Sequence, residues 1–309
     1  MLEGQTMGTS FSVQARCPVP MKAVVRRALT QVDEQMSTYN PESELNQFLA
    51  QPLDVWVAAS ANLFEVVRAA NTVSEESSGA FDATIGPIVD LWGFGPGHGV
   101  LSPPTDQAIS NALSRVGYSG VELKEGGELR RTQDVALDLS AIAKGFGVDL
   151  VGRELNRLDC ADYLIEVGGE LLAHGLNKRS QPWRIGIEIP GEEGVEVANK
   201  ILKLQEVGVA TSGDYRNYFV HEGRRYSHTF DPRTGKPVSH QLAAVTVVHA
   251  STMFADAYAT AMSVMGPQQG YEFAISKGLP VMFVVRIPGE HESYETRYTP
   301  QMQAYLALP

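Results

Sequence analysis

The stretch STMFADAYATAMSVMG, residues 251–266, is built largely from Ala, Met, Phe and Val, yet it carries Asp256 and Thr260 four positions apart. Its first hydroxyl residues can cap the start of a helix, and its final glycine stands where a helix stops. The spacing therefore predicts a buried helix over 251–265. A strand expected over 242–249 leads directly into that helix, so the fold must bury a strand and helix in succession.

Further elements follow from helical spacing of apolar residues and from clusters of β-branched and aromatic residues. The expected helices are 22–37, 58–77, 104–116 and 140–158. The other expected strands are 8–15, 162–167, 183–189, 216–221 and 280–286. Because helices and strands do not alternate strictly, we expect an α+β fold with antiparallel sheets rather than a doubly wound parallel fold.

The composition is that of a soluble globular protein and narrows the possible functions. The chain has 309 residues, of which 43% are hydrophobic and 20% charged, enough for one large domain or two smaller ones. No run approaches the ~20 consecutive apolar residues of a membrane-spanning helix. A net charge of −11 without a Lys/Arg cluster predicts no nucleic-acid partner. Neither the glycine motif of a dinucleotide-binding fold nor a P-loop is present, so any nucleotide must be bound by a different kind of site.

The cysteines and the N-terminus leave the compartment open. Cys17 and Cys160 fit no zinc or redox spacing, and we expect two unpaired residues, with a disulfide as the alternative. The N-terminal stretch has neither the basic nor the apolar region of a signal peptide. The chain is then either cytoplasmic or a mature protein from which a leader was removed.

Asp256 and Thr260 share one face of the expected helix, because residues four apart are neighbours on a helix. The alanines around them are small enough for a bulky group to approach. A carboxylate and a hydroxyl together suit a hard cation such as Mg²⁺ or Ca²⁺. The alternative is a local cap or salt bridge for Asp256 and a bond from Thr260 to a carbonyl one turn earlier.

A second chemical segment is DLSAIAKGFG, residues 138–147. Ser140 is the expected N-cap of a helix, and Lys144 lies within the first turns. A helix N-terminus with a nearby lysine can bind an anion. The alternative is an ordinary capped helix with a solvated lysine.

Two further segments are rich in aromatic and turn-forming residues. GAFDATIGPIVDLWGFG (79–95) contains Asp82 and could line a flat pocket for a ring, or could simply be a buried turn. YSHTFDPRTGKPV (226–238) contains His228 before a strong turn signal, DPRTG. A lone histidine is more often structural than catalytic, so this segment alone decides nothing.

Taken in order, these segments resemble the FAD:protein FMN transferase family, also called the ApbE family. The resemblance covers nearly the whole chain, because it also includes MGTSFSV (7–13), MSTYNPESELNQF (36–48), EVGGE (166–170) and TSGDYRNYF (211–219). It implies an ApbE-like, T-fold-like α+β architecture, with antiparallel sheets flanked by helices and two intimately joined halves. It also implies a single domain over residues 1–309.

The resemblance implies a Mg²⁺-dependent flavin transferase. Such an enzyme cleaves FAD, its substrate, attaches FMN through a phosphoester bond to a threonine of a target protein, and releases AMP. The implied partners are acceptor proteins such as quinone reductase subunits or related electron-transfer proteins. The chain has no D-G-x-[ST]-G-A-T acceptor motif of its own, so we do not expect it to modify itself. The alternatives are a Mg²⁺-dependent FAD pyrophosphatase, which gives FMN and AMP, and a flavin-binding protein without turnover.

The resemblance also assigns residues and a compartment. Metal ligands would be Asp256, Thr260 and the backbone carbonyl of Ala141. His228 would be the catalytic base, because its unperturbed pKa of about 6.5 suits proton transfer near neutral pH. The flavin contacts would be Met7, Tyr39, Ala80, Phe81, Asp82, Asp138, Lys144 and Phe230. The implied location is the periplasm, with a lipoprotein anchor in a full-length precursor, while the sequence leaves the cytoplasm open.

Overall fold

The structure is a computed structural model that describes residues 1–95, 102–189, 197–213, 218–221, 224–289 and 293–307. The chain forms two compact units. Unit 1 comprises Met1–Thr30, Lys144–Tyr215 and His240–Pro309, and unit 2 comprises Gln31–Ala143 and Arg216–Ser239. The expectation of one domain over residues 1–309 stays a prediction.

Unit 1 contains an eight-stranded sheet in which every neighbouring pair is antiparallel. In spatial order its strands are β1 (Leu2–Thr6), β2 (Thr9–Arg16), β6 (Asp162–Val167), β7 (Glu170–His174), β10 (Val207–Gly213), β15 (Leu242–His249), β16 (Val281–Ile287) and β17 (Ser293–Tyr298). The expected α+β class with antiparallel sheets is confirmed. A separate hairpin joins β8 (Trp183–Ile189) to β9 (Val197–Leu204).

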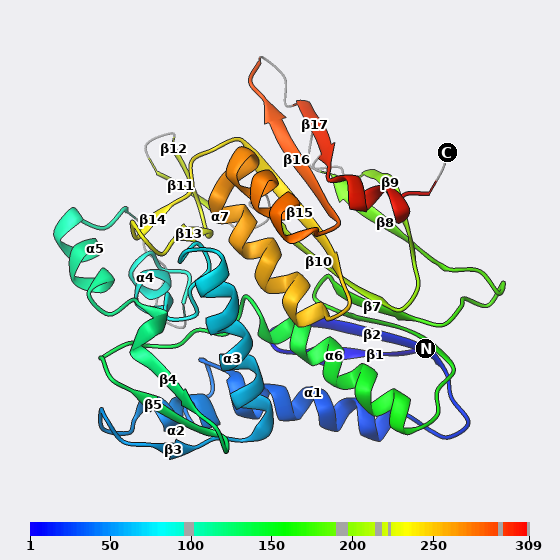
Figure 1. Cartoon of the computed structure of the whole chain (residues 1–309), viewed down its shortest axis with the longest axis horizontal. Helices are drawn as coiled ribbons and strands as arrows, with labels where there is room; N and C mark the ends of the chain where they lie inside the picture. The colour runs from blue at the N-terminus through cyan, green and yellow to red at the C-terminus, as the bar shows by residue number, and fades with distance from the viewer. Residues whose placement is uncertain (96–101, 190–196, 214–217, 222–223, 290–292, 308–309) are drawn as a thin grey trace. The chain divides into compact units, whose positions relative to one another are not determined.

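Strand β15 lies at the centre of the core of unit 1. Its residues from Leu242 to Val248 are all buried, since both faces of the strand are covered. Helix α7 (Thr252–Lys277) lies along β10 and β15 on one face (Figure 1). Side chains of β8 and β9 pack with those of β15 and β16 in one apolar cluster, which includes Ile187, Leu202, Ala244 and Met282.

Helix α7 has a break that the glycine in its sequence anticipates. Its backbone leaves helical geometry at Gly266, with φ 81° and ψ −177°. Pro267 then opens a second helical segment that runs to Lys277, in the first-turn position that proline favours. The expected helix end at residue 265 is confirmed, and the segment after it was missed.

The other helices of unit 1 are α6 (Ala143–Arg157) and the short 3₁₀ helix η3 (Pro300–Ala304). Helix α1 (Lys22–Met36) crosses the boundary between the units at residues 30 and 31. Helix α6 packs closely on the sheet at Gly152, where an added Cβ would lie 2.5 Å from Leu172 and 3.7 Å from Ile165.

Unit 2 is assembled from short elements. Its helices are α2 (Glu44–Leu49), α3 (Ala61–Glu76), α4 (Gly86–Leu91), α5 (Asp106–Leu113) and the 3₁₀ helix η1 (Tyr118–Gly120). Its three-stranded sheet has the order β3 (Val57–Ala58), β5 (Glu128–Arg131) and β4 (Val121–Lys124). Two hairpins complete it: β11 (Tyr218–His221) with β12 (Arg224–Ser227), and β13 (Phe230–Asp231) with β14 (Lys236–Pro237). Four side chains form an apolar core beneath them: Ile88, Trp92, Ile109 and Phe230.

Most of the long expected elements are present, with ends that differ by up to three residues. Helix α6 begins at Ala143, so Ser140 is not its N-cap, and that prediction was wrong. Instead the carboxylate of Asp138 accepts the Ser140 N–H at 2.9 Å and closes a turn before the helix. Of the strand expected over 216–221, residues 216 and 217 lie outside the described residues.

The two cysteines form a disulfide, so the expectation of unpaired residues was wrong. The antiparallel register of β2 and β6 places Arg16 opposite Asp162. Cys17 follows the one strand and Cys160 precedes the other, and their Cα atoms lie 4.1 Å apart. A sequence separation of 143 hides this proximity, because only the sheet register creates it.

We expect reduction of the Cys17–Cys160 bond to lower the free energy of unfolding by about 2–5 kcal/mol, since the bond closes a long loop in the unfolded chain. Urea unfolding with and without a phosphine reductant measures the effect. The double variant Cys17→Ser/Cys160→Ser is the control, and its unfolding midpoint should not respond to reductant. Equal stability of the oxidised and reduced wild type would contradict the prediction.

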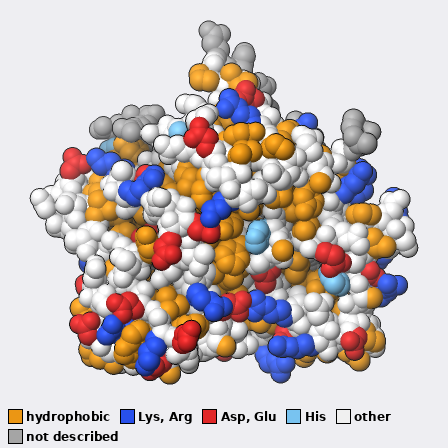
Figure 2. Space-filling view, viewed as in Figure 1, with side chains coloured by type: hydrophobic (Ala, Val, Ile, Leu, Met, Phe, Trp, Pro, Cys, Tyr) orange, Lys and Arg blue, Asp and Glu red, His pale blue; other side chains and the backbone are white. Residues whose placement is uncertain are grey.

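The surface offers two further observations. On the face shown in Figure 2, acidic and basic side chains are interspersed between exposed apolar ones. Among the residues that the structure describes, no helix combines the length and apolar character needed to cross a membrane.

Candidate functional site

The first turns of α7 place Asp256 and Thr260 on one face, as the sequence predicts. Ser251 is the N-cap, and its side chain accepts the Phe254 N–H. Asp256 is only 5% exposed, while Thr260, one turn later, is half-buried. This helix therefore presents a buried carboxylate beside a hydroxyl that solvent or a ligand can reach.

The carboxylate of Asp256 is held by the start of α6. The Gly145 N–H donates to Asp256 Oδ2 at 3.1 Å. Gly145 is the third residue of α6, where backbone N–H groups have no partner within the helix. Asp256 thus satisfies one of these donors and lies at the positive end of the α6 dipole.

The glycine at position 145 lets the two helices approach closely. An added Cβ there would lie 2.4 Å from the Thr252 carbonyl oxygen and 2.8 Å from the Met253 Cα. Both atoms belong to the backbone of α7 and cannot rotate away. The hydrogen bond from Gly145 to Asp256 therefore depends on the missing side chain.

Two buried acids and a half-buried lysine surround this contact. Lys144 Nζ lies 3.4 Å from Glu170 Oε1 and 3.8 Å from Asp256 Oδ2. Glu170 is 4% exposed, and its Oε2 atom has no hydrogen-bond partner among the described residues. With both acids ionised the three side chains carry one net negative charge, and a bound cation would favour that ionised state. Asp256 therefore has a salt-bridge partner, as the alternative interpretation expected, but that partner lies on α6 and is not local to α7.

Burial dominates the ionisation of both acids. It raises the pKa of Glu170 to about 8, with Lys144 opposing the shift and Asp256 adding to it. Burial also raises the pKa of Asp256, while Lys144 and the Gly145 N–H oppose the shift. Without a further positive charge, Glu170 therefore retains its proton at neutral pH.

We expect Glu170 to make the metal-free protein lose stability as the pH rises between about 4.5 and 8. The folded protein keeps the Glu170 proton up to about pH 8, whereas the unfolded chain loses it near the ordinary value of 4.5. The loss approaches about 1.4 kcal/mol per pH unit for one group.

The measurement compares wild type with Glu170→Gln, which mimics the protonated acid, by urea unfolding in EDTA at pH 5.5 and 7.5. Wild type should lose stability relative to the variant at the higher pH. Parallel pH dependences for the two proteins would contradict the raised pKa.

In unit 2, Asp82 stabilises a buried turn. Its carboxylate accepts the Thr84 N–H at 2.8 Å, the Thr84 hydroxyl at 2.6 Å and the Tyr118 N–H at 3.0 Å. Burial raises the pKa of Asp82, and these hydrogen bonds oppose the shift. Ala80 and Phe81 are buried beside it. Residues 79–85 form the buried turn that was the alternative interpretation, whereas residues 86–91 form α4. Flavin contacts by Ala80, Phe81 and Asp82 stay a prediction.

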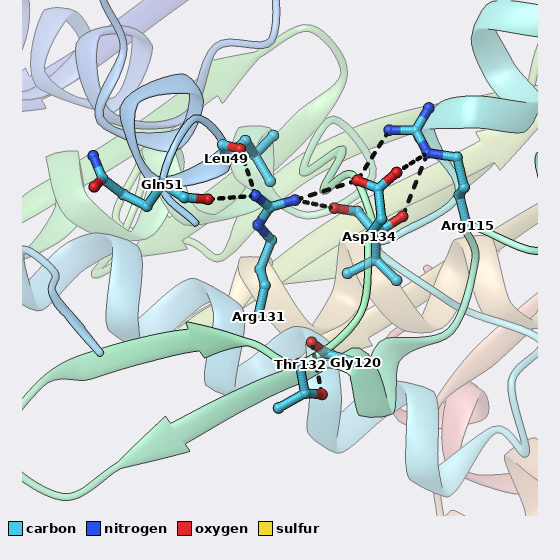
Figure 3. Close-up of polar contacts among 8 residues, drawn as sticks. Leu49, Gln51, Arg115, Gly120, Arg131, Thr132 and Asp134 are labelled. Carbon is cyan, nitrogen blue, oxygen red and sulfur yellow. Dashed lines mark hydrogen bonds and ion pairs between the residues drawn. The ribbon is translucent and has the colours of Figure 1, made fainter. Parts of the chain in front are cut away.

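The loop after β5 carries Asp138 and Ala141. The buried Arg131, at the end of β5, fixes the beginning of this loop (Figure 3). Arg131 donates to the carbonyl oxygens of Leu49 at 2.7 Å and Gln51 at 2.8 Å. It also donates to the Val135 carbonyl, within the loop itself, at 3.2 Å. Because one guanidinium joins these backbone groups, Arg131 anchors the beginning of the loop to the end of α2.

The same loop is anchored further along. The Asp138 N–H donates to the Ala83 carbonyl at 2.6 Å, which brings two of the sequence-predicted segments together. Tyr39 is 67% exposed, and its pKa is raised by partial burial and by the negative charges of Asp138 and Asp90. Tyr39 and Asp138, both expected to contact flavin, are therefore close enough to interact electrostatically.

His228 belongs to an aromatic cluster in unit 2. The Phe94 ring lies 6.3 Å from the His228 ring and 5.7 Å from the Phe230 ring, measured between centroids. Phe230 also packs 5.8 Å from Trp92, whose indole N–H donates to the Gly235 carbonyl at 2.9 Å. The DPRTG turn expected after His228 is confirmed as the loop between β13 and β14. Phe230 is buried, so its role as a flavin contact stays a prediction.

Met7 lies in the tight turn between β1 and β2. Its φ of 46° and the φ of 71° at Gly8 are both positive, as a two-residue hairpin turn requires. A positive φ is uncommon for methionine and often marks a functional site. The Met7 side chain reaches α6, where its Cε would lie 3.0 Å from a Cβ added at Gly147.

The predicted residues thus divide between the two units. Unit 1 brings together Lys144, Asp256 and Thr260, with Met7 packed on the same helix as Lys144. Unit 2 holds Tyr39, Ala80, Phe81, Asp82, Asp138, Ala141, His228 and Phe230. Sequence reasoning missed Glu170 and Gly145, although the motifs EVGGE and DLSAIAKGFG contain them.

Asp256 and Thr260 could hold a hard cation. They supply a carboxylate and a hydroxyl oxygen one turn apart, which suits Mg²⁺, because this ion takes one or two protein carboxylates. In the described parts of the chain, no group of three or more His, Cys, Asp or Glu side chains gathers as a metal cluster. The donor set therefore fits magnesium better than zinc.

Comparison with known proteins shows that the chain belongs to one family. The ApbE family profile matches residues 7–283. The FAD:protein FMN transferase of Vibrio cholerae is 36% identical over 299 residues, covering 95% of this chain and 89% of that protein. The FAD:protein FMN transferase of Haemophilus influenzae is 36% identical over 297 residues, covering 92% of this chain and 86% of that protein.

Solved structures show the same fold. The flavinyl transferase ApbE of Pseudomonas stutzeri, in its apo form, superposes with a TM-score of 0.88 at 40% identity, covering 98% of this chain and 95% of that one. The flavin transferase ApbE of Vibrio cholerae superposes with a TM-score of 0.90 at 34% identity, covering 99% of this chain and 98% of that one. The ApbE-like architecture expected from the sequence is confirmed.

Proposed function

This chain belongs to the ApbE family and is a flavin transferase, and we propose how it acts. It moves FMN from FAD to a threonine of an acceptor protein with the help of Mg²⁺. The observation that carries the proposal is the buried Asp256, fixed between the Gly145 N–H and the Lys144 ammonium. Because its orientation is fixed by these two contacts, the Asp256 carboxylate can direct a lone pair of one oxygen at a cation.

The proposed reaction exchanges one phosphorus–oxygen bond for another. The threonine oxygen of the acceptor attacks the phosphorus of the FMN half of FAD. The pyrophosphate bond breaks, and AMP leaves with the bridging oxygen. His228 accepts the threonine proton, since a hydroxyl is a weak nucleophile until a base removes that proton.

The proposed metal ligands are Asp256, Thr260 and the backbone carbonyl of Ala141. The chemistry that Mg²⁺ supplies when bound is charge neutralisation on phosphoryl oxygens, which phosphoryl transfer needs more than covalent assistance. Asp256 is a poor candidate for the base, because a bound cation lowers the pKa of a carboxylate. Its role is therefore to hold the ion.

The remaining residues are proposed to bind the flavin nucleotide. Lys144 would contact an anionic phosphate, and its position in the first turn of α6 adds the field of the helix N-terminus. Tyr39 offers an exposed ring for stacking. The other proposed contacts are Met7, Ala80, Phe81, Asp82, Asp138 and Phe230.

We propose that the protein works in an oxidising compartment, specifically the periplasm. The Cys17–Cys160 disulfide supports this location, because such bonds persist outside the reducing cytosol. The proposed acceptors are subunits of a quinone reductase or related electron-transfer proteins that carry the D-G-x-[ST]-G-A-T motif.

The experiment is mass spectrometry of an acceptor domain that bears this motif, incubated with the protein, FAD and Mg²⁺. The expected result is a mass gain of one FMN minus water on the acceptor threonine. The gain should disappear with EDTA and fall strongly with His228→Ala.

Two matched controls define the alternatives. An acceptor with alanine in place of the threonine should gain no mass. Release of FMN and AMP without a gain on the intact acceptor would replace the transferase with a pyrophosphatase. FAD that binds but does not turn over with any divalent metal would leave a flavin-binding protein.

A further inference from the structure

Asp149, which the proposed mechanism does not use, is a buried acid on α6, 8% exposed. Its carboxylate accepts the Thr252 N–H at 2.8 Å, the Met253 N–H at 3.1 Å and the Ser251 hydroxyl at 2.6 Å. All three donors belong to the N-terminus of α7. Asp149 therefore fills the anion site that a helix start creates, from within the same chain.

A reciprocal contact lies one turn away. Asp256 of α7 accepts the Gly145 N–H at the start of α6. Gly145 and Asp149 are four residues apart on α6, and Thr252 and Asp256 are four residues apart on α7. The two helices are thus joined antiparallel by two carboxylates, each of which caps the N-terminus of the other helix.

The start of α7 is in close contact with the backbone of β7 and β10, so it cannot shift without a clash. The Thr252 hydroxyl donates to the Leu171 carbonyl on β7 at 3.3 Å. On β10, a Cβ added at Gly208 would lie 2.3 Å from the Thr252 hydroxyl oxygen and 2.8 Å from its Cα. A residue that sets this contact therefore sets the position of the following turn, which carries Asp256.

We propose that Asp149 is a positioning residue that fixes the register of α7 against α6 and so holds Asp256 and Thr260 where the cation is bound. The inference rests on the proposed role of Asp256 as a metal ligand. A slip of one turn moves a side chain by about 5.4 Å, far more than a Mg²⁺ site tolerates. Asp149 touches neither substrate nor metal in this role.

The test uses Asp149→Asn in the full chain. Both carboxylate oxygens of Asp149 accept hydrogen bonds from α7, and in Asn one of them is replaced by an amide nitrogen, which donates instead of accepting. The first readout is the rate of hydrogen exchange at the Gly145 amide, measured by NMR in the presence of EDTA. We expect exchange to accelerate about tenfold or more, since the partner of that amide, Asp256, is no longer held.

Thr299→Val is the matched control for general destabilisation. It removes a buried hydroxyl that accepts the Val281 N–H and donates to the Leu279 carbonyl, both at 2.8 Å. The control should lower the melting temperature without accelerating Gly145 exchange. Unchanged Gly145 exchange in Asp149→Asn, or equal acceleration in the control, would overturn the proposal. If Asp149→Asn does not fold, Ser251→Ala takes its place, because it removes one of the three donors to Asp149. Ser251→Ala must accelerate Gly145 exchange to a smaller degree than expected for Asp149→Asn. No acceleration in Ser251→Ala would also overturn the proposal.

A second readout separates this inference from the proposed function. The rise in melting temperature on adding Mg²⁺ alone should be at least halved in Asp149→Asn and retained in Thr299→Val. An equal rise in wild type and Asp149→Asn would overturn the positioning role. No rise in wild type would reject the metal assignment, while Gly145 exchange would still decide whether Asp149 positions α7.

Discussion

Asp256→Asn is expected to lower the rate of FMN transfer by about 10²–10³-fold while leaving the protein folded. The amide keeps an oxygen for the Gly145 N–H, so the contact between α6 and α7 survives. It loses the negative charge that a cation requires. The measurement is the initial rate of acceptor labelling at saturating FAD, across a Mg²⁺ titration.

The same change should not reduce stability, and this separates a functional residue from a structural one. Asp256 raises the pKa of the neighbouring Glu170, because the two carboxylates repel each other when both are ionised. Removing one charge leaves Lys144 to pair with Glu170 alone. We therefore expect an unfolding midpoint equal to or above that of wild type, as is common when a charged active-site group is neutralised.

Glu272→Gln is the matched control for Asp256→Asn. It makes the same acid-to-amide change on α7, at an exposed position beyond the break at Gly266. Its labelling rate should stay within about twofold of wild type, as is usual for a surface change outside the site. A wild-type rate in Asp256→Asn would remove this residue from the mechanism.

Gly145→Ala is expected to have the largest effect on stability, about 3–5 kcal/mol of unfolding free energy. The new methyl group would press on the Thr252 carbonyl and the Met253 Cα, so α6 and α7 must separate. Separation breaks the hydrogen bond to Asp256 and leaves a buried carboxylate with one donor fewer. Urea unfolding measures the loss, and FMN transfer should fall with it even under conditions where the variant is folded.

Gly152→Ala tests whether the loss comes from the clash rather than from any alanine on α6. Its Cβ would meet the end of the Leu172 side chain, 2.5 Å away, and that side chain can move. The gain in helix propensity, about 1 kcal/mol, offsets part of the cost. We expect a net change well below that of Gly145→Ala, and equal losses in the two variants would refute the backbone-contact argument.

Many of the long elements, although not β9 or β10, could be read from the sequence because each is specified locally. The apolar run of β15 and the first part of α7, with its serine cap and terminal glycine, carry their own signals. The second part of α7 was missed, since a Gly-Pro pair ordinarily ends a helix. Short elements such as α4 and β7 were missed because they are defined by their packing partners rather than by periodicity.

Only part of the candidate site could be predicted from the sequence, because some of its residues are brought together only by packing between distant elements. Asp256 and Thr260 stand out as polar residues in an apolar helix. Glu170 lies in a short Gly-rich motif. Nothing in the neighbouring sequence indicates that Glu170 pairs with the Lys144 ammonium, as does Asp256, 86 positions later. Asp149 looks like one more polar residue in a helix until α7 is placed on it. The disulfide was hidden likewise, because pairing depends on the register of β2 and β6.

The order of strands in the sheet has a consequence for how the protein is made. Strand β2 pairs with β6, and β10 pairs with β15, so unit 1 joins three segments of the chain. Two stretches of unit 2 separate these segments, 113 residues over 31–143 and 24 residues over 216–239. At about 5–20 residues per second, a ribosome needs roughly 7–30 s to deliver β6 after β2. Residues 31–143 can collapse in that interval, whereas the sheet must wait with its apolar strands uncovered. We expect residues 31–143 to fold first, with the long-range pairing of unit 1 as the slow and aggregation-prone step.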